Sequence, residues 1–126
     1  MMDMHRQLLV VGPVKQVYVL CRGERCPIVE FIDGLDARTR DRLNALIERI
    51  AWHGPPRNRE KYRRIKHHRL VSELVLDEVK LGQVRILCFT DADGALVLTN
   101  GFVKKRASQL AREVERAIQM IEDYHE

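Results

Sequence analysis

The sequence contains few of the features that mark a secreted or metal-dependent protein. Its 126 residues include only three cysteines, Cys21, Cys26 and Cys88. Their odd number and the Cys-x4-Cys spacing argue against the disulfide framework of a secreted protein, and no second Cys or His pair has zinc-knuckle spacing. His67 and His68 are adjacent, so they cannot readily bind one ion together from a regular element. We therefore expect no metal and no cofactor, and we expect Cys88 to be a core residue.

Long apolar runs are missing as well. The apolar stretch at residues 8–11 is too short for a signal-peptide core or a membrane span, which predicts a cytoplasmic protein without membrane contact. Repeats, low-complexity segments and linkers are absent, so residues 1–126 are expected to form one domain. Residues 1–13 are expected to be a flexible tail or the lead-in to a strand.

Positive charge is what the sequence has in excess. The net charge is +4 and the pI is about 9.2, values that admit a nucleic-acid partner without establishing one. Residues 57–69, RNREKYRRIKHHR, contain seven Arg or Lys against one Glu. Such a run is by default a solvated surface, but its like charges repel one another, so it also favours an anionic partner.

The spacing of apolar residues predicts an α+β domain in the order β-α-α-β-β-β-α, with a mainly antiparallel sheet. Pro27 favours the first turn of a helix, Asp36 the N-cap of the next, and Gly54 with two prolines its end. The expected helices are residues 27–35, a second helix from 36 to about 53, and a third from Ala107 onward. The expected strands are residues 14–21, 70–76, 84–89 and 95–102.

Asp93-Gly94 is a strong hairpin signal between the last two strands. A loop at 91–94 places Arg85 opposite Asn100, whereas a two-residue loop places it opposite Phe102. Both registers put these three side chains on one face, and Lys104 joins them if the strand continues. Only a β-bulge would break this parity.

This arrangement allows two interpretations. Arg and Lys bind phosphate oxygens and an aromatic ring can stack on an unpaired base, which is typical of a site for RNA. In the structural alternative, Arg85 forms an ion pair, for which Glu73 is a candidate partner. Phe102 is then a core residue, and residues 104–106 are solvated or precede the last helix.

The motifs in this order resemble the RelE/ParE superfamily of type II toxins, in its HigB-like, phage-derived branch. The resemblance covers about residues 14–124 and rests on CPIVEFIDGL, NREKYRRIKHHRLVSEL, VRILCF, TNGFVKKR and AREVERAIQMIEDY. It implies a RelE-like fold and a metal-independent, ribosome-dependent mRNA endonuclease that inhibits translation. It also implies a cognate antitoxin, often of the helix-turn-helix type, through which the pair would bind operator DNA.

The resemblance also implies roles for individual residues. Arg85 would stabilise the phosphate, and Lys104 or Lys105 would be the cation after Gly-Phe. The missing cation or acid is left to Lys66, His67, His68 or Arg69, of which His68 with Lys66 would serve acid/base or RNA contacts. The remaining RNA contacts would come from Arg64, Lys66, His67, Arg69, Phe102 and Arg106.

The sequence departs from the pattern of the family at three places, one of which is Gln83-Val84 where the family has a Gly/aromatic lead-in to the arginine. Asn100 stands where the family has His, and Val75 where it usually has Arg or Lys. They keep two alternatives open: a ParE-like toxin that poisons gyrase without nuclease chemistry, and an attenuated toxin that acts mainly as an antitoxin-binding module.

Overall fold

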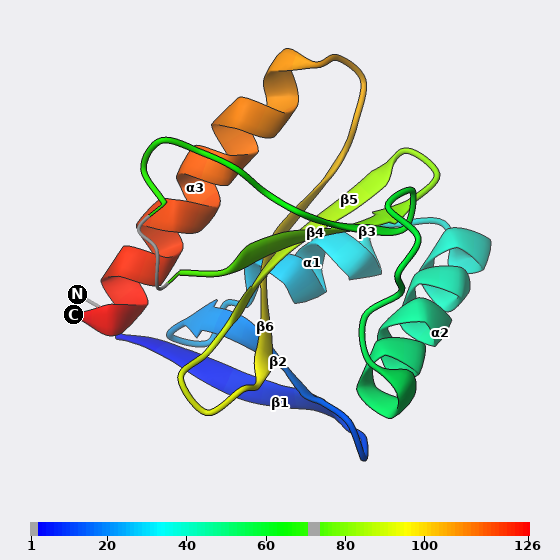
Figure 1. The fold of residues 1–126 in the computed structure, drawn as a ribbon, viewed down its shortest axis with the longest axis horizontal. Coiled ribbons are helices and arrows are strands. Elements are labelled where there is room, and N and C mark those ends of the chain that lie inside the picture. Colours follow the sequence, from blue (N-terminus) through cyan, green and yellow to red (C-terminus); the bar gives the residue numbers. More distant parts are fainter. Residues whose placement is uncertain (1–2, 71–73) are drawn as a thin grey trace.

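Six strands form one sheet that is covered by helices on both faces. The computed structural model describes residues 3–70 and 74–126. The strands are β1 (Met4–Val11), β2 (Gln16–Arg22), β3 (Tyr62–Arg64), β4 (Leu76–Leu81), β5 (Val84–Thr90) and β6 (Leu96–Val103). The helices are α1 (Pro27–Asp33), α2 (Ala37–His53) and α3 (Ser108–His125). The spatial order is β1-β2-β6-β5-β4-β3, and among these described strands only the β2–β6 pair is parallel, which confirms the predicted α+β class (Figure 1).

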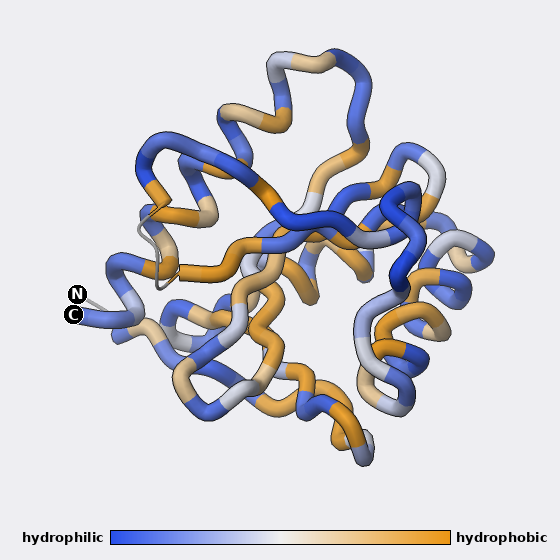
Figure 2. The backbone as a smooth tube through the Cα atoms, in the orientation of Figure 1, coloured by the Kyte–Doolittle hydropathy of each residue, from blue (hydrophilic) through white to orange (hydrophobic). Residues whose placement is uncertain are grey.

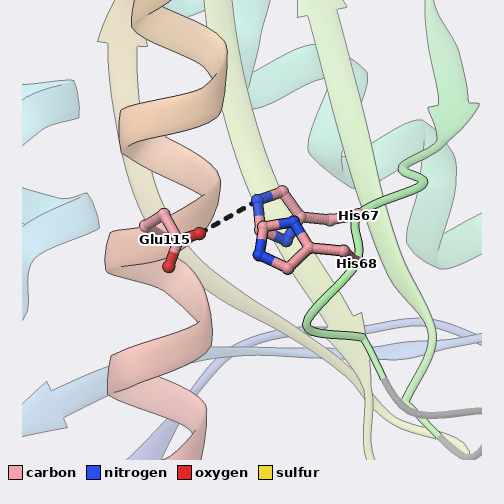
Figure 3. Close-up of side chains that lie close together, drawn as sticks. All are labelled: His67, His68 and Glu115. Carbon is pink, nitrogen blue, oxygen red and sulfur yellow. Dashed lines mark ion pairs between the residues drawn. The ribbon is translucent and has the colours of Figure 1, made fainter.

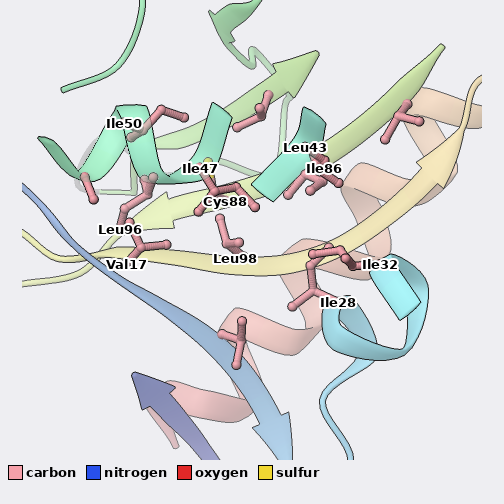
Figure 4. Packing of buried hydrophobic residues seen from close by; sticks show 14 of the residues in the cluster. Val17, Ile28, Ile32, Leu43, Ile47, Ile50, Ile86, Cys88, Leu96 and Leu98 are labelled. Atoms are coloured by element: carbon pink, nitrogen blue, oxygen red, sulfur yellow. The ribbon is translucent and has the colours of Figure 1, made fainter. Parts of the chain in front are cut away.

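The sheet separates two apolar cores. On one face, α1 and α2 pack against β2, β5 and β6, and Leu43, Ile47 and Ile50 of α2 point into this core (Figure 4). On the other face, α3 packs its apolar stripe against the sheet around Phe89. Cys88 is buried in the first core, as predicted, and burial raises the pKa of its thiol. None of the helices described is long and apolar enough to cross a membrane.

The predicted helix boundaries are confirmed by their caps. Pro27 is the first residue of α1, where its missing N–H costs nothing. The Asp36 carboxylate accepts a hydrogen bond from the Thr39 amide at 3.1 Å and so caps α2. Gly54 ends α2 with a φ of 84°, a conformation that a side chain would disfavour.

The N-terminal segment is a strand rather than a flexible tail. β1 pairs with β2 along its whole length, from Met4 opposite Arg22 to Val11 opposite Gln16. Of this segment, Leu8 and Val11 are exposed, so hydrogen bonding to β2, more than apolar burial, holds it in place.

The strand predicted at 70–76 was misplaced. β4 begins only at Leu76, and residues 71–73 of the predicted strand lie outside the described residues. The sequence of β4, LDEVKL, has no clear apolar alternation because Asp77 and Glu78 are both buried. Their partners are arginines of β3, a short strand inside the basic segment that the sequence did not predict.

The β5–β6 hairpin places Arg85 opposite Phe102, one of the two predicted registers. Neither predicted loop is correct, however, because Thr90 pairs with Leu96 next to the turn. A register shift near Thr99 then restores the predicted parity. The Thr99 hydroxyl stabilises this irregularity by donating to the Leu87 carbonyl at 3.0 Å.

Cys21 and Cys26 form a disulfide, which was not predicted from the sequence. β2 ends one residue after Cys21 and α1 starts one residue after Cys26, so the short turn between them brings the two side chains together. The bond closes the loop at residues 22–25.

Candidate functional site

The basic segment 57–69 runs from the end of α2 to the side of α3. Figure 2 shows it as a nearly unbroken hydrophilic path. Part of its charge is neutralised within the protein. Arg63 Nε donates to Glu78 Oε1 at 2.6 Å, and Arg64 Nε donates to Asp77 Oδ1 at 2.7 Å. Both carboxylates are buried, so these arginines hold β3 on the sheet as well as contributing positive charge.

Arg85, the predicted phosphate-binding residue, is buried and has partners within the protein. Its Nη1 donates to the carbonyls of Gly82 and Val84, and its Nε lies 3.6 Å from Glu78 Oε2. Only 9% of its side chain is exposed. The ion pair considered from the sequence therefore exists, with Glu78 as its carboxylate. The residue named as a candidate partner, Glu73, lies outside the described residues.

Asn100 and Phe102 lie on the same face as Arg85 but point into the protein. Phe102 is 7% exposed and packs in the core beneath α3, so its ring is not presented to solvent. Asn100 Nδ2 donates to the carbonyl and the carboxylate of Glu113 on α3, at 3.2 and 3.0 Å. In this structure both residues join β6 to α3.

Lys104, Lys105 and Arg106 form a second basic cluster, between β6 and α3. Gln109 fixes this turn because its Oε1 accepts from the amides of Lys105 and Arg106. The Lys104 amide donates to the Gln83 carbonyl at 2.7 Å. The backbone is thus held while the three cationic groups form no ion pair with any carboxylate in the described part of the chain.

His67, His68 and Arg69 lie against the middle of α3. His67 Nε2 is 3.0 Å from Glu115 Oε1, and its Nδ1 accepts from the Arg69 amide at 3.2 Å. Arg69 also forms ion pairs with Glu115 and Glu122. The guanidinium of Arg69 is the main reason that the pKa of Glu115 lies below its usual value. His68 and Lys66 are exposed.

A groove of about 410 Å³ lies between the basic segment and the N-terminal half of α3. Its two sides differ in character, one cationic and one apolar. The cationic side is formed by Arg59, Arg63, Arg64, Ile65, Lys66 and His67, and the apolar side by Ala107, Leu110, Ala111 and Val114. Residues 104–106 immediately precede Ala107 in the chain, so the second basic cluster continues from one end of the apolar side. The cationic side can bind the phosphates of an anionic chain.

The structure brings some of the predicted site residues together and separates others. Arg64, Lys66 and His67 line the groove, whereas Arg85 and Phe102 do not. Asn100 borders a different pocket of about 650 Å³, lined also by Arg22, Arg25 and Arg116.

No local sequence pattern marks Arg63, Glu78 or Glu115 individually. The two glutamates could be predicted as partners only by pairing the arginines and histidines of residues 57–69 with carboxylates of β4 and α3. That step requires the strand and helix register, which no local pattern supplies.

Comparisons with known proteins agree with this architecture. Residues 30–122 match the family model described as "Phage derived protein Gp49-like (DUF891)". The fold is similar to a chain in the crystal structure of the archaeal RelE–RelB complex from Pyrococcus horikoshii OT3. The TM-score is 0.53 and the identity 16%, over 64% of this chain and 89% of that chain. No curated protein matches the sequence. The RelE-like fold implied by the sequence motifs is therefore confirmed.

Proposed function

This chain belongs to the phage-derived Gp49-like family, and we propose that it is the toxin of a type II toxin–antitoxin system, acting as a metal-independent, ribosome-dependent mRNA endonuclease. The observation that carries the proposal is the cluster at residues 104–106. The backbone of these residues is fixed by hydrogen bonds next to a basic groove, and their cationic groups are not neutralised by any described carboxylate. RNA supplies the missing negative charge.

The proposed chemistry requires three kinds of group. Attack by the 2′-hydroxyl of RNA on the adjacent phosphate needs a base, cations for the charge that develops, and an acid for the leaving oxygen. Lys104 and Lys105 are the candidates for the cations. His68, which is exposed, is the candidate for proton transfer, with Lys66 two residues before it in the sequence.

Arg85 has a different place in this scheme. Its guanidinium is bound to two carbonyls and lies close to Glu78, so direct contact with a phosphate requires it to leave these partners. We assign Arg85 a supporting role, in which it holds the turn between β4 and β5 through the Gly82 and Val84 carbonyls. Gln83 in this turn accepts the hydrogen bond from the Lys104 amide.

The partner is proposed to be a cognate antitoxin. The structurally similar chain belongs to a complex of RelE with RelB. An antitoxin that contacts the basic groove or an adjacent apolar surface would block RNA. If it is of the helix-turn-helix type, the complex would bind operator DNA through the antitoxin.

A second function is favoured by one feature of the site. Asn100 stands where the family pattern has His, so an amide takes the place of a side chain that can exchange protons. Glu113 accepts hydrogen bonds from this amide and holds it in place. A toxin that binds its target without cleaving RNA, such as a ParE-like gyrase poison, needs no acid or base at this position. A chain that only binds an antitoxin would need none either.

Induced expression without an antitoxin distinguishes these functions. The endonuclease predicts growth arrest, new 5′ ends within transcripts and intact DNA. Gyrase poisoning predicts DNA damage with intact transcripts, and a binding module predicts normal growth. Co-expression with the product of an adjacent gene for a small helix-turn-helix protein should restore growth in the first two cases.

A further inference from the structure

His67, His68 and Glu115 form a cluster of metal-ligating side chains (Figure 3). One donor atom from each lies within 4.8 Å of the others. Adjacent residues of a strand point to opposite faces, and this was the reason to expect no shared ion. The two histidines instead follow β3 in an irregular segment. Their rings stack with centroids 4.3 Å apart and both face α3.

We propose that these three side chains bind a divalent transition-metal ion of the zinc type. Two imidazoles and one carboxylate are a ligand set that zinc accepts, whereas calcium and magnesium favour oxygen ligands alone. His67 Nε2 and Glu115 Oε1 are 3.0 Å apart. Two ligands of one tetrahedral zinc ion, each about 2.1 Å from the metal, are separated by roughly 3.4 Å. A small outward movement of one side chain therefore admits the ion between them.

Arg69 supports the carboxylate from its other side. It forms an ion pair with Glu115 through Oε2, so that Oε1 is directed at the imidazoles. Contacts of this kind fix the orientation of a metal-binding carboxylate. The same guanidinium keeps the pKa of Glu115 low, so this ligand is ionised at neutral pH.

Metal binding requires one local rearrangement. His67 Nδ1 accepts from the Arg69 amide, so the ring proton lies on Nε2, facing Glu115. An ion bound at Nε2 moves this proton to Nδ1 and breaks the bond to the amide. The exchange costs this hydrogen bond and the 3.0 Å contact between His67 Nε2 and Glu115 Oε1, and it gains three metal–ligand bonds.

An ion at this place would connect the segment after β3 to the middle of α3. His67 also lines the basic groove, so the ion would fix one wall of that groove. It would also occupy His68, the candidate for proton transfer. Zinc is then expected to inhibit RNA cleavage, a consequence that rests on the proposed function, whereas the binding site itself does not.

Titration of the protein with Co²⁺, followed by competition with Zn²⁺, tests the site. We expect one ion per chain, visible absorption bands of a four-coordinate Co²⁺ complex, and their loss when Zn²⁺ is added. His68→Gln should weaken binding at least tenfold, roughly the effect of losing a metal ligand or its support. His68 is exposed and on the surface, so this variant is expected to fold.

His67→Gln and Glu115→Gln should weaken binding to a similar extent, with circular dichroism as the check of folding. His53→Gln and His125→Gln remove exposed histidines elsewhere and serve as matched controls. Absence of Co²⁺ and Zn²⁺ binding at micromolar concentrations overturns the proposal, as does equal affinity in His68→Gln. Neither result depends on whether the protein cleaves RNA.

Discussion

Two basic clusters flank the same groove, and they differ in what neutralises them. In the segment 57–69, Arg63, Arg64 and Arg69 each form an ion pair with a carboxylate of β4 or α3. Residues 104–106, in contrast, form no such pair within the described chain, and only their backbone is tied down. The density of charge in a sequence therefore does not reveal which cations are available to a ligand.

The difference follows from burial. Glu78 is 1% exposed, and a carboxylate in such a place must have cationic or hydrogen-bonding partners. The arginines of β3 satisfy this need and are consequently part of the fold. The cations that precede α3 are on the surface, where solvent or a ligand can satisfy them. We expect substitutions in the first cluster to affect stability and those in the second to affect binding.

The largest effect on the free energy of unfolding is expected for Glu78→Gln. This change leaves Arg63 and Arg85 without their shared carboxylate, and removal of one partner from a buried ion pair costs about 3 kcal/mol. Urea unfolding should show this loss. Glu60→Gln, at an exposed carboxylate, is the control and should change the free energy of unfolding by less than about 0.5 kcal/mol. Equal stability of the two variants would mean that the pairing with Glu78 does not hold the sheet.

The opposite outcome is expected for the triple substitution of Lys104, Lys105 and Arg106 by Gln. Stability should change little, because these side chains are not buried. Affinity for single-stranded RNA should fall, and the slope of log K against log salt should become shallower by about 2, since each lost phosphate contact contributes roughly 0.7.

The matched control for this variant is the triple substitution of Arg38, Arg42 and Arg49 by Gln. It removes the same charge from the exposed side of α2, away from the groove. If both triple variants bind RNA equally weakly, net charge rather than the groove determines the affinity.

The smallest effect on stability is expected for the partly exposed ion pair of Arg69 and Glu115. Because the folded-state pKa of Glu115 is lowered from its ordinary value of 4.5, its ionised form stabilises the fold above that pH. This contribution is lost as the pH falls below about 4.5. Arg69→Gln should raise the pKa of Glu115 and weaken this acid-side dependence, which carbon-13 NMR of the carboxyl group can follow. Arg57→Gln should leave that pKa unchanged, and a shift of similar size in both would exclude a specific pair.

Much of the fold could be predicted from local sequence signals. Pro27, Asp36 and Gly54 mark helix boundaries through backbone chemistry that acts within a few residues. β4 could not be predicted in this way, because its buried Asp77 and Glu78 are compensated only by residues of another strand. β1 was missed for a related reason, since it is held by pairing with β2 more than by apolar burial.

The candidate site shows the same limit. The alternation of side chains along the hairpin correctly predicted that Arg85, Asn100 and Phe102 lie on one face. This agreement depends on a register shift that could not be predicted from the sequence. Parity does not indicate whether a face is covered, and here α3 packs over it and buries the phenylalanine. The position of a helix relative to a sheet is set by tertiary packing. Arg85, Asn100 and Phe102 therefore share the predicted face without forming a solvent-exposed site.

The most direct test of the proposed function is to map transcript 5′ ends after induction of the native chain and the two triple variants. The native chain and the α2 variant are predicted to produce new internal ends and growth arrest, whereas the variant at residues 104–106 should produce neither while accumulating to the same level. Unaltered cleavage by that last variant, or intact transcripts with the native chain, would contradict an RNA-binding role for these cations.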